Sequence, residues 1–297
     1  MWVHARGQLS LELPRVMAVV NLTPDSFFDG GSLLAPGADD PNAGMAVRLC
    51  RGLVQQGADI LDLGGESTRP GSTPVDAALE LRRVLPVLRR LCDDPELAGV
   101  PISVDTRHAE VALAAMQAGA AIINDVSGLA DPAMAGVAAR TGAGLVLGHL
   151  RGEPATMQSH VVFADLLAEV ARELASAVER ALRAGVPGDR ILVDPGIGFG
   201  KTAEQSAALL AASHELTQQT GCPVLIGASR KAFLGAITGK PVGERMIASV
   251  AAAVIAVERG ASVVRVHDVA ATAEALRVVA AVRAAERSTL RGTRDAG

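Results

Sequence analysis

The feature of the sequence that most restricts its fold is a unit that recurs eight times: a short apolar run, a polar residue at its end, and a stretch with helical periodicity. The apolar runs cover residues 16–20, 59–63, 101–104, 121–123, 144–147, 191–194, 224–226 and 262–266. The helical stretches cover residues 44–57, 75–91, 110–118, 132–140, 163–182, 204–219, 247–259 and 270–285. Such runs are typical of strands buried in a parallel sheet, and no hairpin signal separates them.

Eight strand-and-helix units in 297 residues predict an α/β protein with one domain over residues 1–285, a (β/α)8 TIM barrel. The alternative is an open Rossmann-like sheet, which would need an early Gly-x-Gly-x-x-Gly turn that the sequence lacks. Residues 1–13 alternate loosely and predict a short N-terminal β-ribbon in which Trp2 has a packing role. Residues 286–297 lack apolar periodicity, so we expect a flexible tail there.

The composition excludes several classes of protein. Hydrophobic residues make up 49% and charged residues 20% of the chain, which is typical of an α/β protein with a large core. The net charge is −4 with no basic block before the last residues, so nucleic acid is not an expected partner. Cys50, Cys92 and Cys222 lie far apart and indicate reduced thiols. Because the sequence shows neither a signal peptide nor a membrane-spanning run, we expect a soluble, cytoplasmic protein.

Residues 191–202, Ile-Leu-Val-Asp-Pro-Gly-Ile-Gly-Phe-Gly-Lys-Thr, show how these strands end. Three apolar residues lead into Asp194, and a Pro-Gly turn follows. A Walker phosphate loop would need Gly where Pro195 stands, so Lys201 is interpreted as a bystander. Phe199 lies between glycines and is best explained as the wall of a ligand site, although a core role is the alternative. A strand-end aspartate is also common in turns, so the case for a site depends on the other strands.

Polar residues stand at or near the end of every predicted strand. They are Asn21, Asp62, Asp105, Asn124, His149, Asp194, Ser229, Arg230, Lys231, Arg265 and His267. Because the carboxyl ends of barrel strands form one face, we expect these side chains to converge. Asp105, Asn124 and Asp194 offer paired acceptors and donors, which suit a flat, nitrogen-rich heterocycle such as a fused pyrimidine.

The last two strands carry positive charge. Lys231, Arg265 and His267 lie in the quarter of the barrel where phosphate commonly binds. Arg265 stands inside an apolar strand, so we expect it to contact a buried anion or acceptor, because an unpaired buried guanidinium is costly. Structural roles stay open for other residues: His149 more often packs than reacts, and Arg230 can be an ion-pair partner.

Seven motifs, in order, resemble those of the dihydropteroate synthase family of the folate pathway. They are Asn-Leu-Thr-Pro-Asp-Ser-Phe at 21–27, Gly-Gly-Glu-Ser-Thr-Arg-Pro-Gly at 64–71, Ser-Val-Asp-Thr at 103–106, Ile-Asn-Asp-Val at 123–126, Asp-Pro-Gly-Ile-Gly-Phe-Gly-Lys at 194–201, Ser-Arg-Lys at 229–231 and Arg-Val-His at 265–267. The resemblance covers about residues 14–283. It implies a TIM-barrel transferase that joins 6-hydroxymethyl-7,8-dihydropterin diphosphate to 4-aminobenzoate and releases diphosphate.

The resemblance also implies roles for residues at matching positions. The pterin pocket would be formed by Asp105, Asn124, Asp194 and Lys231. The diphosphate would be bound by Thr68, Arg265 and His267, and its Mg²⁺ by Asn21. The aminobenzoate pocket would be formed by Phe27, Pro70 and Phe199 as the loops 21–31 and 64–71 close, and Ser67 and Arg69 would also bind substrate. Catalysis would depend on Asp105, which opposes a cationic pterin, and on Lys231, Arg265 and His267, which stabilise the leaving group.

The chain departs from the family pattern at several positions, among them Phe28, Gly148, Leu150 and Ala232. Ala232 replaces a common Ser whose hydroxyl would meet the aminobenzoate carboxylate, so we expect an altered affinity for sulfonamides. Two other functions stay open: a methyltransferase of the methyltetrahydrofolate type, which has no use for the motifs at 67–70 and 265–267, and a non-catalytic pterin-binding paralogue. The family implies a homodimer, and the Ala/Val-rich face of residues 247–257 suits one, although it can also pack on the barrel.

Overall fold

The structure is a computed structural model that describes residues 1–23, 41–67, 74–152, 157 and 161–292, with side chains to residue 286. Eight parallel strands form its centre. They are β3 (Arg15–Asn21), β4 (Ile60–Gly64), β5 (Ile102–Asp105), β6 (Ile122–Asp125), β7 (Gly144–Gly148), β8 (Ile191–Asp194), β9 (Leu225–Ile226) and β10 (Val263–Val266). The sheet order is β8-β7-β6-β5-β4-β3-β10-β9, and a parallel bridge between Val193 and Val224 closes it into a barrel. The predicted TIM barrel is confirmed.

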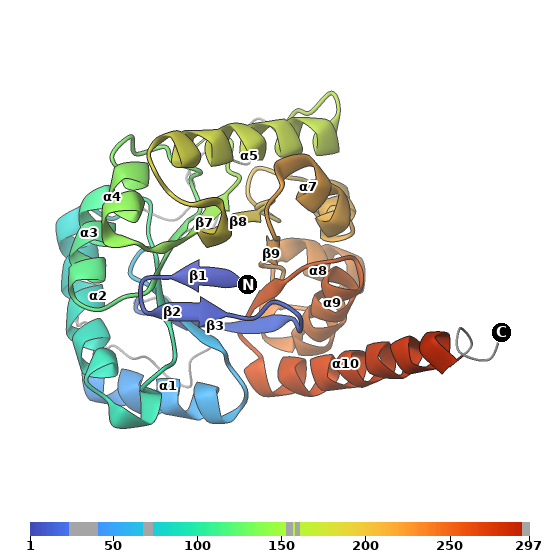
Figure 1. Ribbon diagram of the computed structural model, residues 1–297, viewed down its shortest axis with the longest axis horizontal. Coiled ribbons are helices and arrows are strands. Elements are labelled where there is room, and N and C mark those ends of the chain that lie inside the picture. The colour runs from blue at the N-terminus through green and yellow to red at the C-terminus, as the bar shows by residue number, and fades with distance from the viewer. Residues whose placement is uncertain (24–40, 68–73, 153–156, 158–160, 293–297) are drawn as a thin grey trace.

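Helices surround the strands (Figure 1). They are α1 (Ala43–Gln55), α2 (Ala77–Cys92), α3 (Ala109–Gln117), α4 (Met134–Thr141), α5 (Leu166–Arg183), α6 (Ala203–Leu210), α7 (Ser213–Thr220), α8 (Ala232–Thr238), α9 (Met246–Glu258) and α10 (Val269–Gly292). Short 3-10 turns cover Pro95–Leu97, Gly188–Arg190 and Val242–Glu244. Asp side chains cap two of the amphipathic helices: Asp76 accepts from Leu79 N, and Asp165 accepts from Ala168 N.

Two helices differ from the predicted boundaries. The single helix expected over residues 204–219 is two helices, because the chain turns at Ala212 between α6 and α7. The two halves pack against different neighbours, α6 against α8 and α7 against α5, and helical propensity alone does not indicate such a turn. The last helix continues past residue 285 to Gly292 and projects from the barrel (Figure 1). Arg283 anchors it, because its Nη2 donates to Val257 O at 2.7 Å.

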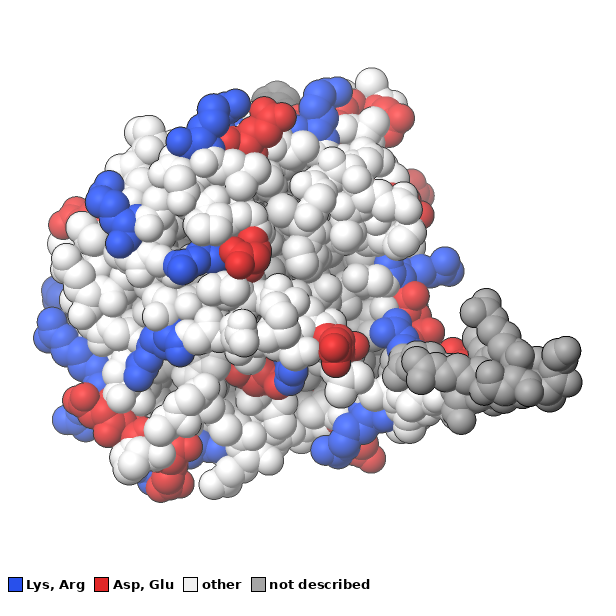
Figure 2. All heavy atoms as spheres, viewed as in Figure 1, with Lys and Arg blue, Asp and Glu red and all other residues white. Residues whose placement is uncertain are grey.

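The amino ends of the strands are covered by the expected ribbon, an antiparallel hairpin of β1 (Trp2–His4) and β2 (Gly7–Leu9). Trp2 is fully buried, and its Nε1 donates to Arg190 O at 2.9 Å. The apolar residues around it are Met17, Ile60, Ala121, Ile122, Val146, Leu192, Leu225 and Val263. Figure 2 shows charged residues of both signs interspersed over the described part of this face, with no basic block among them.

Cys50 and Cys222 are buried, Cys92 is half-buried, and all three are free thiols. Among the helices that the structure describes, none combines the length and the apolar character that crossing a bilayer requires.

Candidate active site

A cavity of about 750 Å³ opens at the carboxyl ends of the strands. Among the predicted site residues, its lining includes Asn21, Ser67, Asp105, Phe199, Lys231, Arg265 and His267. Asn124 and Asp194 are not part of that lining and lie buried beside it, bound to neighbouring groups. The predicted residues Phe27, Thr68, Arg69 and Pro70 lie outside the described residues, as does Phe28. Of the thirteen residues expected to bind substrate or metal, seven therefore line this cavity, two lie buried beside it and four lie outside the described residues.

Arg265 contacts two buried carboxylates, as its position in an apolar strand predicted. Its Nε donates to Asp62 Oδ2 at 2.6 Å, and its Nη2 donates to Asp105 Oδ2 at 2.7 Å. Asn124 Nδ2 donates to the same Asp62 oxygen at 3.1 Å. Because β3 separates β10 from β4 in the sheet, Arg265 reaches these carboxylates through the interior of the barrel. The guanidinium therefore organises the base of the cavity.

Two carboxylate oxygens of this network lack a partner among the described residues, and one of them belongs to a residue that lines the cavity. Asp62 Oδ1 and Asp105 Oδ1 are buried and have no hydrogen-bond partner among the described residues. Burial raises the pKa of Asp105 above its ordinary value, and the charge of Arg265 opposes that rise. A buried acceptor without a partner is unfavourable, so a ligand that donates to Asp105 regains that free energy.

Asp194, Lys231 and Phe199 form a second group beside this network. Asp194 Oδ1 accepts from Gly196 N at 2.8 Å. Burial raises the pKa of Asp194, and Lys231 opposes this. Burial likewise lowers the pKa of Lys231 to about 8, against the opposing effect of Asp194. The Lys231 ammonium donates to Ile197 O and lies 4.0 Å from the centroid of the Phe199 ring, a cation–π contact.

The loop between β9 and α8 is fixed by residues of two later elements. Arg230 N donates to Ser249 Oγ at 2.9 Å, and Arg230 Nε lies 3.0 Å from Asp268 Oδ2. These contacts hold Arg230 at φ +58°, a left-handed conformation that is unfavourable for a side chain of this kind. His267 Nδ1 lies 3.0 Å from Ser229 Oγ. The structure thus gives Arg230 the structural role that the sequence left open, and it places Lys231 at the cavity.

Lys201, which we interpreted as a bystander, is part of this region. Its side chain is 4% exposed, and the residue lines the cavity. Its Nζ lies 2.9 Å from Phe199 O and 3.0 Å from His149 Nδ1. Burial lowers the pKa of Lys201 to about 7. The motif contained no sign of this contact, because His149 is 52 residues away in the sequence.

A group of acidic residues beside the cavity was also not predicted. Glu66 accepts from Arg107 Nε at 2.9 Å and from Val75 N at 3.1 Å, so it joins the two ends of the loop between β4 and α2. Glu80 Oε2 lies 2.8 Å from His108 Nδ1. Glu66, Glu80 and His108 are close enough to share a metal ion. However, Arg107 and His108 already neutralise the two carboxylates, which indicates an ion-pair network.

Oxygen atoms that suit Mg²⁺ lie instead in the lining of the cavity. A Cβ atom placed on Gly64 would lie 3.9 Å from Asn21 Oδ1 and 4.0 Å from Asp105 Oδ2, so both oxygens face the same small space. Amide and carboxylate oxygens are ligands that Mg²⁺ accepts, and the ion commonly takes only one or two protein ligands when substrate phosphates supply others. The residues present therefore fit an ion that arrives with a diphosphate.

Comparisons with known proteins agree with this site. The model of the family described as "Pterin binding enzyme" matches residues 17–267. Dihydropteroate synthase of Neisseria meningitidis serogroup B is 44% identical over 282 residues, 93% of this chain and 95% of that protein. The Yersinia pestis dihydropteroate synthase in a sulfonamide complex has a TM-score of 0.88 at 40% identity, covering 96% of this chain and 100% of that one. The Burkholderia cenocepacia enzyme complexed with 7,8-dihydropteroate has a TM-score of 0.84 at 41% identity, covering 97% and 98%.

The chain therefore belongs to the pterin binding enzyme family, a class defined by a TIM barrel with its ligand site at the carboxyl ends of the strands. Within that family it is a member of the dihydropteroate synthases, which are transferases of folate synthesis. This membership favours the synthase over the methyltransferase alternative.

Proposed function

We propose that the cavity joins 6-hydroxymethyl-7,8-dihydropterin diphosphate to 4-aminobenzoate and releases 7,8-dihydropteroate and diphosphate. The observation that carries this assignment is the network of Arg265, Asp62 and Asp105 at the base of the cavity. It combines buried acceptors with a fixed cation in one space. A bicyclic, nitrogen-rich ring needs the acceptors, and a departing diphosphate needs positive charge nearby.

The pterin binds, in this proposal, on the acceptor side. Its amino group and ring N–H donate to the free oxygen of Asp105 and to Asp194, and its acceptors meet Asn124. Asn124 and Asp194 lie behind the lining, so the ring must enter the barrel interior to reach them. Lys231 lies next to Asp194 and completes this pocket. A ligand buried in this way loses its water, which strengthens each hydrogen bond to it.

The reaction breaks the bond between the pterin methylene carbon and the diphosphate oxygen, and the electron pair leaves on that oxygen. Positive charge then develops on the pterin, and the ionised Asp105 carboxylate opposes it. Arg265 and His267, with Thr68, stabilise the diphosphate. The nitrogen of 4-aminobenzoate forms the new bond to the methylene carbon and loses a proton.

Asn21 is the residue we propose for Mg²⁺, which supplies charge that neutralises the diphosphate when it is bound. Phe199 and Ser67 form part of the aminobenzoate pocket, because both line the cavity and Phe199 contacts Lys231. Phe27, Arg69 and Pro70 are proposed for the same pocket by resemblance alone.

We further propose that the chain is a cytoplasmic homodimer that associates through α9 and α10. Exposed apolar side chains recur on one face of each helix, eight residues apart in α9 and four apart in α10: Ile247 is 80% and Ile255 46% exposed, and Val278 is 62% and Val282 52% exposed. An apolar face of this kind on two adjacent helices is typical of an interface. Light scattering on the wild type and on Ile247→Asp tests the dimer, because the charged side chain should convert it to a monomer.

The activity is tested by incubating the purified chain with both substrates and Mg²⁺ and detecting 7,8-dihydropteroate by mass spectrometry. We expect the product from wild type, and a loss of at least about 10²-fold in Asp105→Asn, which removes a group aimed at developing charge. Asp189→Asn is the matched control, because that aspartate is exposed on a distant turn. Wild type that binds the pterin substrate but forms no product would make the chain a non-catalytic paralogue. Complementation of a strain without its own synthase gives an independent result.

A further inference from the structure

His149, directly after β7, is a buried histidine with no role in the reaction described above. Its side chain is held at both ring nitrogens: Nε2 lies 2.9 Å from Glu173 Oε2, and Nδ1 lies 3.0 Å from Lys201 Nζ. A carboxylate can only accept and an ammonium can only donate, so the neutral ring with its proton on Nε2 satisfies both partners. Burial lowers the pKa of His149, and Lys201 lowers it further, which agrees with a neutral ring.

Lys201 is bound in an unusual way for a buried lysine. Its Nζ contacts three neutral acceptors, namely His149 Nδ1 at 3.0 Å, His149 O at 3.4 Å and Phe199 O at 2.9 Å. Within the described part of the chain, no carboxylate forms an ion pair with it. Three acceptors match the three N–H bonds of an ammonium. The side chain thus connects the end of β7 to the loop that carries Phe199.

The loop that carries Phe199 packs directly on His149. Gly196 has φ +66°, and a Cβ atom there would lie 1.9 Å from His149 O, so only glycine permits this contact. Phe199 N donates to Gly196 O at 3.0 Å, which closes the turn. On the cavity side, Lys231 lies over the Phe199 ring. Lys201 therefore binds the backbone of the loop, while Lys231 contacts the aromatic side chain that the loop carries.

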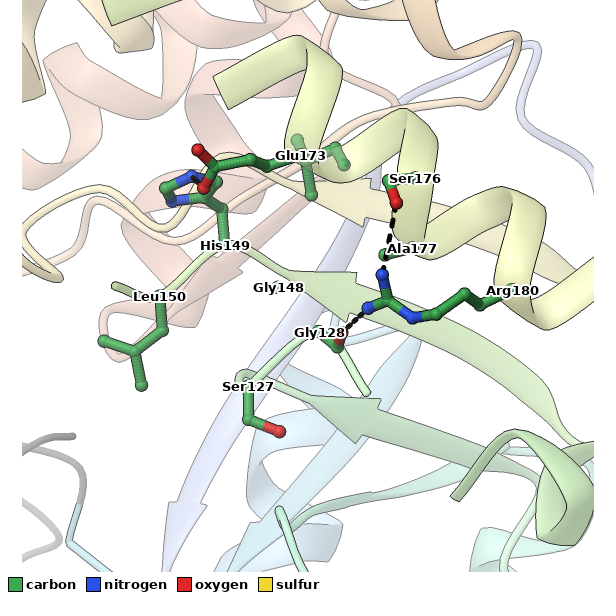
Figure 3. Close-up of a pocket in the computed structure, with 10 residues that line it drawn as sticks. Ser127, Gly128, Gly148, His149, Leu150, Glu173, Ser176, Ala177 and Arg180 are labelled. Carbon is green, nitrogen blue, oxygen red and sulfur yellow. Dashed lines mark hydrogen bonds and ion pairs between the residues drawn. The ribbon is translucent and has the colours of Figure 1, made fainter. Parts of the chain in front are cut away.

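Glu173 forms the outer end of these contacts. It belongs to α5, its side chain is 38% exposed, and Arg151 binds it together with Glu169. Figure 3 shows its carboxylate beside the His149 ring. Both residues line a cavity of about 240 Å³. The hydrogen bonds thus run continuously from an outer helix to the wall of the active site.

We propose that Glu173, His149 and Lys201 form a positioning chain that fixes the backbone of Phe199 and thereby sets the aminobenzoate pocket. This inference rests on the proposed function, because it assigns Phe199 to that pocket. The three residues do not touch the substrates in this proposal. Glu173 selects the tautomer of His149, that tautomer gives Lys201 its acceptor, and Lys201 holds the carbonyl of Phe199.

The kinetic test compares Lys201→Met and Glu173→Gln with wild type. Loss of one hydrogen bond to a charged group should raise KM for 4-aminobenzoate about tenfold in Lys201→Met. KM for the pterin diphosphate and kcat should change by less than about threefold, because Asp105 and Asn124 are held by Arg265 and Asp62 and not by this chain of hydrogen bonds. Glu173→Gln should raise the same KM by a smaller factor. Lys240→Met and Glu179→Gln are matched controls, since Lys240 is 57% and Glu179 67% exposed.

A double-mutant cycle separates a chain from independent structural contributions. If the three residues act in series, Glu173→Gln has no further effect on KM in the Lys201→Met background, whereas independent effects would multiply. Urea unfolding of each variant shows whether lost stability accounts for the change. The proposal would be overturned if the effects of the two substitutions on KM for 4-aminobenzoate multiplied. It would also be overturned if KM for 4-aminobenzoate and KM for the pterin diphosphate rose equally.

Nuclear magnetic resonance tests the chain without relying on activity. In ¹⁵N-labelled wild type, the signals of His149, assigned with His149→Asn, should show a neutral ring with the proton on Nε2 between pH 6 and 8. A ring protonated on both nitrogens, or on Nδ1 alone, would overturn the inference. If wild type lacks synthase activity but His149 has the expected tautomer, the proposed function fails while the chain of hydrogen bonds stands.

Discussion

The two ends of the barrel interior differ in chemistry although the same strands supply both. The apolar cluster at the amino ends contains Ile60, Ile122, Leu192 and Val263. Two residues further along each of these strands, the same interior face carries Asp62, Asn124, Asp194 and Arg265. Side chains two positions apart in a strand point to the same face, about 6.6 Å apart. One step along the barrel axis therefore separates a layer that stabilises the fold from a layer that binds ligand.

The two layers contribute to the stability of the fold in different ways. Burial of an apolar side chain such as Val263 is favourable in itself. Burial of Asp62, Asp105 and Arg265 is favourable only while the three remain paired, because each isolated charge would lose its hydration. We therefore expect substitutions in the apolar layer to affect unfolding and substitutions in the charged layer to affect catalysis.

The largest effect is expected for Arg265→Met, which removes the cation of the charged layer. Asp62 and Asp105 then lose their partner, the pKa of Asp105 rises further, and Asp105 is protonated at neutral pH. We expect kcat/KM to fall about 10³-fold, since both the diphosphate contact and the charge opposite the pterin are lost. Diphosphate release at several substrate concentrations measures it.

Arg265→Lys is the control for this variant. It keeps a positive charge but cannot donate to two carboxylates from one planar group, so it should recover only part of the activity. If Arg265→Met retained more than about a tenth of wild-type kcat/KM, Arg265 would not belong to a layer whose side chains determine catalysis.

Trp2→Ala tests the apolar layer. The side chain is fully buried under the barrel and bonds to Arg190 O, so its removal leaves a large cavity. We expect the free energy of unfolding to fall by about 3 kcal/mol in urea titrations. At a temperature where the variant is folded, kcat/KM should equal the wild-type value within about twofold, since the cluster has no contact with the active cavity. A marked loss of kcat/KM in the folded variant would show that the two layers are coupled.

The charge of Lys231 gives a pH-dependent test at the boundary of the charged layer. Burial lowers its pKa to about 8, so the ammonium of the free enzyme loses its proton as the pH rises through that value. We expect kcat/KM to decrease by up to about tenfold per pH unit above that pKa. Lys231→Arg should remove this decrease. Lys201 has a pKa lowered to about 7, so Lys201→Met serves as the control that assigns the decrease to Lys231.

Stability should change in the opposite direction over the same range. Between pH about 8 and about 10.5 the unfolded chain keeps the proton of Lys231 while the folded chain has released it. The contribution of Lys231 to the free energy of unfolding therefore rises with pH where the activity falls. Parallel changes in the two quantities would assign the loss of activity to unfolding.

The barrel and most of the site could be predicted because strand ends carry their own signal. Apolar runs that end in polar residues gave all eight barrel strands, and a guanidinium in the apolar strand 262–266 predicted buried anions. The partners of that guanidinium could not be predicted, because Asp62 lies 203 residues away. Lys201 was misjudged for the same reason: its motif shows which residue is present but not what it contacts. The turn at Ala212 depends on packing against two different helices, which no local pattern records.

The smallest effect is expected at the rim of the charged layer, where Ala232 begins α8 and lines the cavity. Ala232→Ser adds a hydroxyl next to Lys231, within the pocket proposed for the carboxylate of 4-aminobenzoate. One additional hydrogen bond contributes about 1 kcal/mol, which corresponds to about a fivefold change in a dissociation constant. We therefore expect KM for 4-aminobenzoate to fall about fivefold. Sulfonamides that occupy the same pocket should inhibit Ala232→Ser more strongly than wild type by a similar factor. Equal inhibition constants for wild type and Ala232→Ser would show that Ala232 does not alter the affinity for sulfonamides. The ligand-binding layer would then consist only of the residues inside the barrel.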